Sequence, residues 1–137
     1  METTDKMNKD FASYELALAL EKAGFDKPCI AQWAVEPDGK PMLIGSTAFV
    51  FHKANLEGRN VLAPFLWQAQ KWLRSKGIDI AVWRSFSVCH GYHYQIVKDN
   101  DWEHDIVQTV KRGRNYETSL SDAIEVALQL LDNEKKE

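Results

Sequence analysis

Apolar side chains recur at every third or fourth position in three segments of the chain, and this spacing predicts three amphipathic helices. The clearest segment is residues 63–78, whose apolar stripe consists of Leu62, Phe65, Leu66, Ala69, Trp72 and Leu73. Pro64 suits the first helical position, where the N–H that proline lacks would have no partner. Gly77 suits the residue after the helix, which often adopts a left-handed conformation. These residues predict a central helix with defined ends.

The other two helices carry similar signals at their ends. The earlier helix is expected to start after Ser13, whose side chain suits an N-cap, and to stop at Gly24. The later helix is expected over residues 120–131, after a cap at Thr118 or Ser119. The three helices are therefore spread along the whole chain.

Four segments between these helices have the composition of strands, and they are residues 29–35, 43–51, 79–86 and 93–97. Short turns at residues 37–40 and 87–91 join them in pairs, which makes two antiparallel hairpins. The predicted order is αββαββα. We therefore expect an α+β fold with a four-stranded, mainly antiparallel sheet that is packed with three helices.

Alternation within the last two predicted strands assigns their side chains to two faces. Ile80 and Val82 are expected to face the core, which leaves Trp83 on the other face. In the next strand Tyr94 shares a face with Ile96. The two strands together therefore offer one face for a helix and one face for other contacts.

The chain has 137 residues, which is the length of one ordinary domain. We expect a flexible tail at residues 1–12, a single α+β domain at residues 13–132 and a charged tail at residues 133–137. No apolar run reaches the length of a membrane span, and the N-terminal residues lack an apolar signal region. The expectation is therefore a cytoplasmic protein with no membrane partner.

Four segments of the chain resemble a known group of proteins, and they are SYELALALEKAGFD, APFLWQAQKWLRSKGI, YHYQIV and TSLSDAIEVALQLL. The group consists of small uncharacterised proteins from Bacteroides-type bacteria and their phages and prophages. The layout is also similar to that of phage α/β/α-sandwich proteins. The likeness covers residues 13–132 and implies a phage or mobile-element origin. It brings no established catalytic residue, cofactor or partner.

Cys89, His90 and His93 are the residues that an enzyme or a metal-binding protein would use. Thiolate and imidazole are zinc ligands, and a cysteine beside a base can act as a nucleophile. The cluster supplies at most three ligands, however, and no second ligand pair accompanies it. We therefore assign no catalytic or metal-binding residue and expect no cofactor, and an enzyme or metal protein stays the alternative.

Single-stranded nucleic acid is a further candidate ligand, because aromatic and basic residues gather on the last two predicted strands. The residues concerned are Trp83, Arg84, Phe86, Tyr92 and Tyr94. The net charge of −3 excludes binding driven by bulk charge, although a local basic patch is compatible with it. The chain also lacks the aromatic motif of RNA-recognition domains. Nucleic acid is therefore a less favoured partner.

Tryptophan, tyrosine and arginine anchor protein interfaces, and five tryptophans are many for a chain of this length. The candidate interface residues are Trp33, Trp67, Trp83, Arg84, Tyr92 and Tyr94. We therefore predict a small accessory protein that acts by binding, either as a homodimer or with a protein partner.

Overall fold

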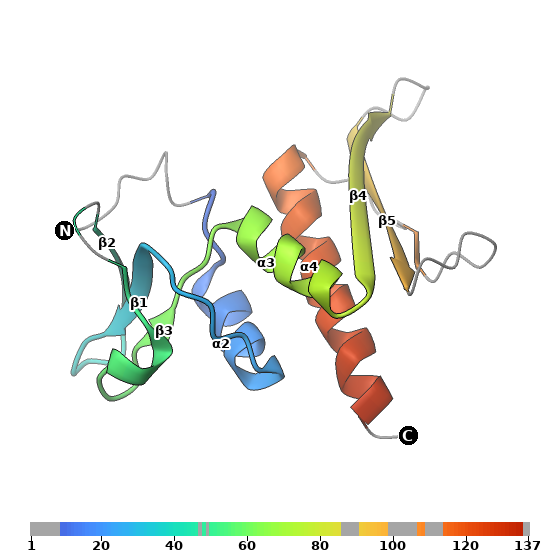
Figure 1. The fold of residues 1–137 in the computed structure, drawn as a ribbon. Coiled ribbons are helices and arrows are strands. Elements are labelled where there is room, and N and C mark those ends of the chain that lie inside the picture. Colours follow the sequence, from blue (N-terminus) through green and yellow to red (C-terminus); the bar gives the residue numbers. More distant parts are fainter. Residues whose placement is uncertain are drawn as a thin grey trace. The chain divides into compact units, whose positions relative to one another are not determined.

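The computed structural model describes residues 9–46, 48, 50–85, 91–98, 107–108 and 114–135 (Figure 1). The fold is α+β, with antiparallel strand pairing throughout the described ranges. The chain divides into two compact units, of which the first ends at Ala69 and the second begins at Gln70. None of the helices in the described ranges has both the length and the apolar composition needed to cross a membrane.

The first unit begins with helix α2 (Tyr14–Ala23), whose two ends have the predicted chemistry. The Ser13 hydroxyl accepts the N–H of Leu16 at 3.2 Å, which confirms the N-cap. Gly24 adopts a left-handed φ of 104°. The Phe25 N–H then donates to a carbonyl of the last helical turn at 2.9 Å. These bonds satisfy the free backbone groups at the end of the helix, as in a Schellman motif.

The first sheet contains β1 (Ala31–Val35), β2 (Pro41–Gly45) and β3 (Val61–Leu62) in the order β2-β1-β3. The predicted turn joins β1 to β2. Its Asp38 carboxylate accepts the N–H of Lys40 at 2.9 Å, which fixes the tight connection. One face of this sheet packs into a core of buried residues formed by Phe11, Ala31, Leu43 and Ala63.

The predicted flexible tail reaches residue 12, but the structure includes its last residues in the fold. Phe11 and Ala12 are buried. The Ala12 N–H donates to the carbonyl of Pro64 at 2.8 Å, and Phe11 forms an antiparallel bridge with Phe65. The apolar residue at position 11 therefore draws this segment into the core, while residues 1–8 lie outside the described ranges.

Helix α3 (Leu66–Ser75) starts later than predicted, so Pro64 is not its first residue. The bridge between Phe65 and Phe11 keeps the chain before the helix extended. The Gln68 side-chain oxygen then accepts the Phe65 N–H at 2.9 Å, which is one half of a capping box. A tertiary contact thus overrides the helix-start signal of proline.

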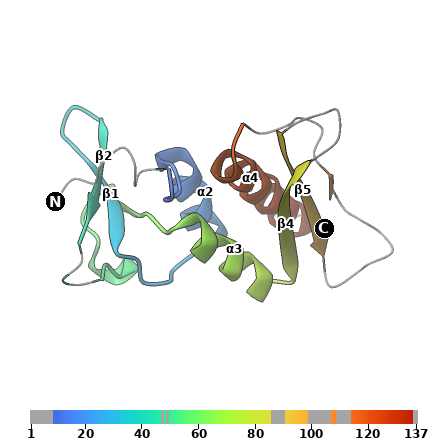
Figure 2. The ribbon, with the colours of Figure 1, turned by 90° about the horizontal axis from the view of Figure 1, so that it is seen from above.

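The second unit contains β4 (Ile78–Ser85), β5 (Gly91–Lys98) and β6 (Val107–Gln108) in the order β4-β5-β6. Gly77 precedes β4 with a φ of 87°, the predicted left-handed conformation. Helix α4 (Tyr116–Lys135) lies along β4 and β5 and contacts both strands (Figure 2). The sheet of this unit therefore has one face covered by a helix.

The predicted caps of α4 are wrong, because the helix begins earlier. Asn115 is the N-cap, and its side-chain oxygen accepts the N–H of Thr118 at 2.8 Å. Ser119 is buried instead, and its hydroxyl donates to the carbonyl of Tyr92 at 3.3 Å. The residue that resembled a cap therefore joins the helix to the sheet beneath it.

The expected single four-stranded sheet is also corrected, because the described strands form two sheets of three strands each. The sequence did not predict β3 and β6, since a segment of two residues carries no alternation that could be recognised. The predicted second strand covered residues 43–51, whereas β2 ends at Gly45 and Phe51 separately bridges to Cys29. The single domain expected over residues 13–132 stays a prediction.

Candidate functional site

Trp33, the first of the predicted interface tryptophans, is a half-buried part of the first unit. Its indole N–H donates to the carbonyl of Ala12 at 2.9 Å. Its ring also meets the ring of Tyr14 edge to face, with centroids 6.2 Å apart. Both contacts tie β1 to the segment before α2, so the indole stabilises this unit rather than offering a free surface.

Trp67, near the start of α3, is 57% exposed. Its ring stacks on Phe65 with centroids 5.8 Å apart, and Phe65 stacks in turn on Phe11 at 4.4 Å. The exposed ring is therefore held by a row of aromatic rings that ends in the core of the first unit. It is available for contact, but its described ring contacts bring no charged or hydrogen-bonding group that would define a ligand.

Trp83 on β4 is 44% exposed. It lies directly opposite His93 on β5, and the two rings stack with centroids 5.9 Å apart. The neighbouring residue on this face of β4, Ala81, is exposed as well. This face of the sheet is the one that alternation places opposite α4, so an aromatic surface remains open there.

The other three candidates lie on the opposite face of the same strands. Arg84 pairs with Tyr92, and Val82 pairs with Tyr94. The ring of Tyr92 meets Tyr116 of α4 edge to face, with centroids 6.2 Å apart. The pleat of the sheet therefore separates these side chains from Trp83, and the predicted aromatic cluster for nucleic acid does not form one surface.

Tyr94 also lies on the face that α4 covers. Desolvation by burial, assisted by the negative charge of Asp122, raises the pKa of its phenol above the usual value. The phenol therefore stays protonated at neutral pH and acts as part of the packing between sheet and helix.

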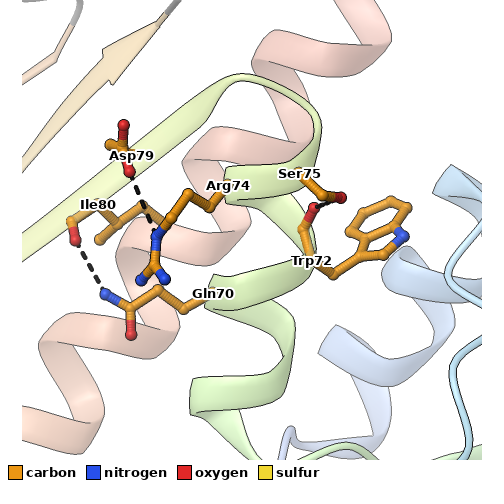
Figure 3. Close-up of polar contacts among 6 residues, drawn as sticks. All are labelled: Gln70, Trp72, Arg74, Ser75, Asp79 and Ile80. Carbon is orange, nitrogen blue, oxygen red and sulfur yellow. Dashed lines mark hydrogen bonds and ion pairs between the residues drawn. The ribbon is translucent and has the colours of Figure 1, made fainter. Parts of the chain in front are cut away.

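β4 is an edge strand, and side chains of α3 cover the first half of its free edge (Figure 3). The Gln70 side-chain amide donates to the carbonyl of Ile80 at 2.9 Å. One helical turn later, the Arg74 guanidinium lies 3.4 Å from the carboxylate of Asp79. Gln70 and Arg74 are four residues apart, so they point from the same side of α3 toward the strand.

The bond from Gln70 shows which backbone groups of β4 face outward. In an antiparallel ladder, residues alternate between bonding to the neighbouring strand and pointing away from it. Since the carbonyl of Ile80 points away from β5, the backbone groups of Val82 and Arg84 do so too. Neither residue has a further hydrogen-bond partner within the described part of the chain. No described group therefore covers the second half of the edge.

We name the segment Val82–Arg84 the open edge. Exposed strand edges bind other strands, and proteins usually block them with proline, lysine, a bulge or a covering element. The open edge has no proline, glycine or lysine, and the described contacts of α3 end at Ile80. Arg84 is exposed and forms no ion pair with any described residue. The open edge thus combines an exposed aromatic ring with backbone groups and a positive charge that have no partner in the described ranges.

The cysteine and histidine candidates do not meet in the described structure. Cys89 and His90 lie outside the described ranges, and His93 stacks on Trp83. Within those ranges, no three His, Cys, Asp or Glu side chains are grouped as metal ligands. The other cysteine, Cys29, is buried, and burial raises the pKa of its thiol to about 12. That thiol is therefore a poor nucleophile at neutral pH.

The first unit also contains a pocket of about 410 Å³, lined by Gln32, Val50, Phe51, His52, Asn55, Glu57 and Asn60. The Asn60 side chain is held in place, because its oxygen accepts the N–H of Val35 at 3.0 Å. The Gln32 side-chain oxygen is buried and has no hydrogen-bond partner among the described residues, so an incoming ligand cannot touch it in this conformation.

A comparison of the chain with models of protein families, with curated proteins and with solved structures found no match. The geometry of the open edge therefore carries the functional inference. The sequence predicted Trp83 and Arg84 as candidate contact residues, but it did not reveal the outward backbone groups beside them. Alternation shows which face a side chain occupies, whereas the neighbour along a strand edge depends on tertiary structure.

Proposed function

We propose that the chain is a cytoplasmic protein-binding module whose open edge takes up an extended segment of a protein partner. The observation that carries this proposal is the outward direction of the backbone groups of Val82 and Arg84, which have no described partner. A strand added there bonds to the backbone, while neighbouring side chains supply specificity. The phage or mobile-element origin stays a prediction.

Three features of the open edge define the segment that it suits. The backbone groups require an extended segment without proline at the bonding positions. The exposed ring of Trp83 favours an apolar or aromatic side chain directly across from it. The guanidinium of Arg84, which forms no ion pair with any described residue, suits a neutral or acidic side chain on the other face but not a positive one. The expected ligand is therefore a short strand that carries an aromatic residue and has no positive charge across from Arg84.

The test starts from random seven-residue peptides displayed on yeast, from which binders to the purified chain are selected. Binding of a selected peptide is then measured by fluorescence anisotropy for the unmodified chain and for two variants. Val82→Pro removes an outward N–H and leaves the β4–β5 ladder complete. Val82→Thr keeps the N–H and the branched side chain, and it serves as the matched control.

We expect Val82→Pro to weaken peptide binding by about tenfold or more, which corresponds to about 1.4 kcal/mol. Val82→Thr is expected to bind within about twofold of the unmodified chain, since the outward N–H stays and only one methyl of this half-buried side chain becomes a hydroxyl. Hydrogen exchange provides a second readout, because the bound peptide protects the amides of Val82 and Arg84. Binding that is insensitive to Val82→Pro, or that protects amides elsewhere, contradicts the proposal.

Two other functions stay predictions. An enzyme or metal site at Cys89, His90 and His93 involves two residues outside the described ranges. Binding of single-stranded nucleic acid requires aromatic rings on one surface, and the sheet places Trp83 on the face opposite to Tyr92 and Tyr94. The open edge is therefore the better supported site.

A further inference from the structure

We infer that the strand taken up by the open edge is the same strand of a second copy of this chain. The two copies pair antiparallel through Val82–Arg84, and a two-fold axis passes beside Trp83. This inference rests on the proposed function, since it names one partner for the same edge. It follows from the hydrogen-bonding direction, the charges and the blocked carbonyl along β4.

Pairing two identical strands restricts the possible registers. Backbone groups that point outward on one strand must meet backbone groups that point outward on the other. With the axis beside Trp83, Val82 lies opposite Arg84 of the second copy, and the outward backbone groups of both residues have no partner among the described residues. The pair can therefore exchange two hydrogen bonds, and the symmetry repeats them on the other side of the axis.

The neighbouring symmetric registers are less favourable. An axis beside Val82 places Arg84 opposite Ile80 of the second copy, but the Ile80 carbonyl already accepts the amide of Gln70 at 2.9 Å. An axis beside Arg84 places two arginines directly opposite each other, and like charges at such positions are destabilising. Of these three registers, the one with the axis beside Trp83 is the one that uses groups without a described partner and avoids facing charges.

The favoured register also brings the two Trp83 rings together. Trp83 becomes a pair without direct hydrogen bonds, in which the two Cα atoms lie only about 4.5 Å apart. Both indoles then lie on the open face, each beside its own His93. An aromatic pair across two strands is stabilising, and it buries rings that are 44% exposed in the single chain. The second copy thus supplies the aromatic side chain that the site favours.

The contact covers three residues of each copy, which is far below the roughly 1,600 Å² of a standard stable interface. We therefore expect a weak dimer that forms only at high concentration. Sedimentation of the unmodified chain is expected to show a rising average mass above 15.7 kDa as concentration increases. Val82→Pro is expected to remain a monomer over the same range, and Val82→Thr to behave like the unmodified chain.

Single cysteines report the register, because a cysteine forms a disulfide with the same cysteine of the second copy only when it lies on the two-fold axis. The variants are Trp83→Cys, Val82→Cys and Arg84→Cys, each combined with Cys89→Ser. Opposed Cα atoms in a strand pair fall within the 4.4–6.8 Å range of disulfides. Glu125→Cys, on an exposed position of α4, gives the rate of random collision. We expect Trp83→Cys to cross-link several times faster than the other three.

Since Trp83→Cys removes one of the contacts, hydrogen exchange of the unmodified chain gives an independent readout. The amides of Val82 and Arg84 are expected to gain protection as the concentration rises. Faster cross-linking of Val82→Cys or Arg84→Cys refutes this register. A chain that stays monomeric at millimolar concentration, without added protection, refutes self-association. In that case, the proposed function is still supported if the chain binds peptides and Val82→Pro abolishes this binding. If the chain neither self-associates nor binds peptides at the open edge, both proposals are refuted.

Discussion

Replacing Trp33 by phenylalanine separates a structural tryptophan from tryptophans that are free to bind. The indole N–H of Trp33 donates to the carbonyl of Ala12 at 2.9 Å, and Ala12 has no exposed surface. Phenylalanine keeps an aromatic ring over Tyr14 but removes the donor. The Ala12 carbonyl is then left in a buried place without its partner.

The cost of this change follows from the lost bond and the lost volume. A buried carbonyl that loses its donor costs about 1–3 kcal/mol. The smaller ring adds part of the cost of a large-to-small substitution, since the surroundings relax incompletely. We therefore expect Trp33→Phe to lower the free energy of unfolding by about 2–4 kcal/mol. That is a large fraction of the 5–15 kcal/mol typical of a natural domain.

Urea unfolding monitored by circular dichroism measures this loss. Trp67→Phe and Trp83→Phe are the matched controls, because these rings are 57% and 44% exposed. Exposed positions usually change stability by no more than about 0.5 kcal/mol. If Trp33→Phe is as stable as the two controls, the Ala12 bond contributes nothing, and Trp33 returns to the candidates for an interface.

Three further changes test the local structure. Gly24→Ala is expected to lower the free energy of unfolding by about 1–2 kcal/mol in urea unfolding, because alanine is strained at the φ of 104° found there. The added methyl meets no atom within 4 Å, so a steric clash would not account for the loss. Asn115→Ala is expected to cost about 1 kcal/mol by the same assay, whereas Thr118→Ala at the cap predicted from sequence stays near neutral. Burial raises the pKa of the Cys29 thiol from 9.0 to about 12, so the folded state holds the thiol proton more tightly than the unfolded state does. The stability that this difference contributes is therefore present below pH 9 and is lost as the pH rises toward 12. In urea titrations at increasing pH, the free energy of unfolding is expected to fall by at most about 1.4 kcal/mol per pH unit from this thiol, and Cys29→Ala is expected to lack this fall. An equal fall in both proteins contradicts the raised pKa of Cys29.

The ends of the first helix could be predicted because their chemistry is local. Ser13 and Gly24 act on backbone groups within a few residues, and the structure confirms both. The starts of the later helices depend on distant contacts. Phe65 is held by Phe11, which lies more than fifty residues earlier, and Ser119 is drawn inward to a carbonyl of β5. Rules based on neighbouring residues cannot predict when such a distant contact overrides a local helix-start signal.

The arrangement of the strands shows the same limit. Alternation correctly placed Trp83 on the face of its strand opposite to the buried Ile80, because the period of a strand is a local property. It could not determine whether the two hairpins share a sheet, since that depends on contacts between strands far apart in the sequence. The described strands β3 and β6 lie next to β1 and β5, whereas β2 and β4 have no described neighbour on their outer sides.

The length of the open edge follows from the side chains that α3 can offer. Gln70 and Arg74 lie on one side of the helix and engage the strand at Ile80 and Asp79, one residue apart. The described contacts of α3 with β4 therefore end at Ile80, and the outward backbone groups of Val82 and Arg84 have no described partner. Edge strands commonly carry a proline or a charged residue that discourages pairing, and Arg84 is the one such residue of the open edge. A strand that pairs here must therefore keep positive charge away from Arg84, as the register with the axis beside Trp83 does.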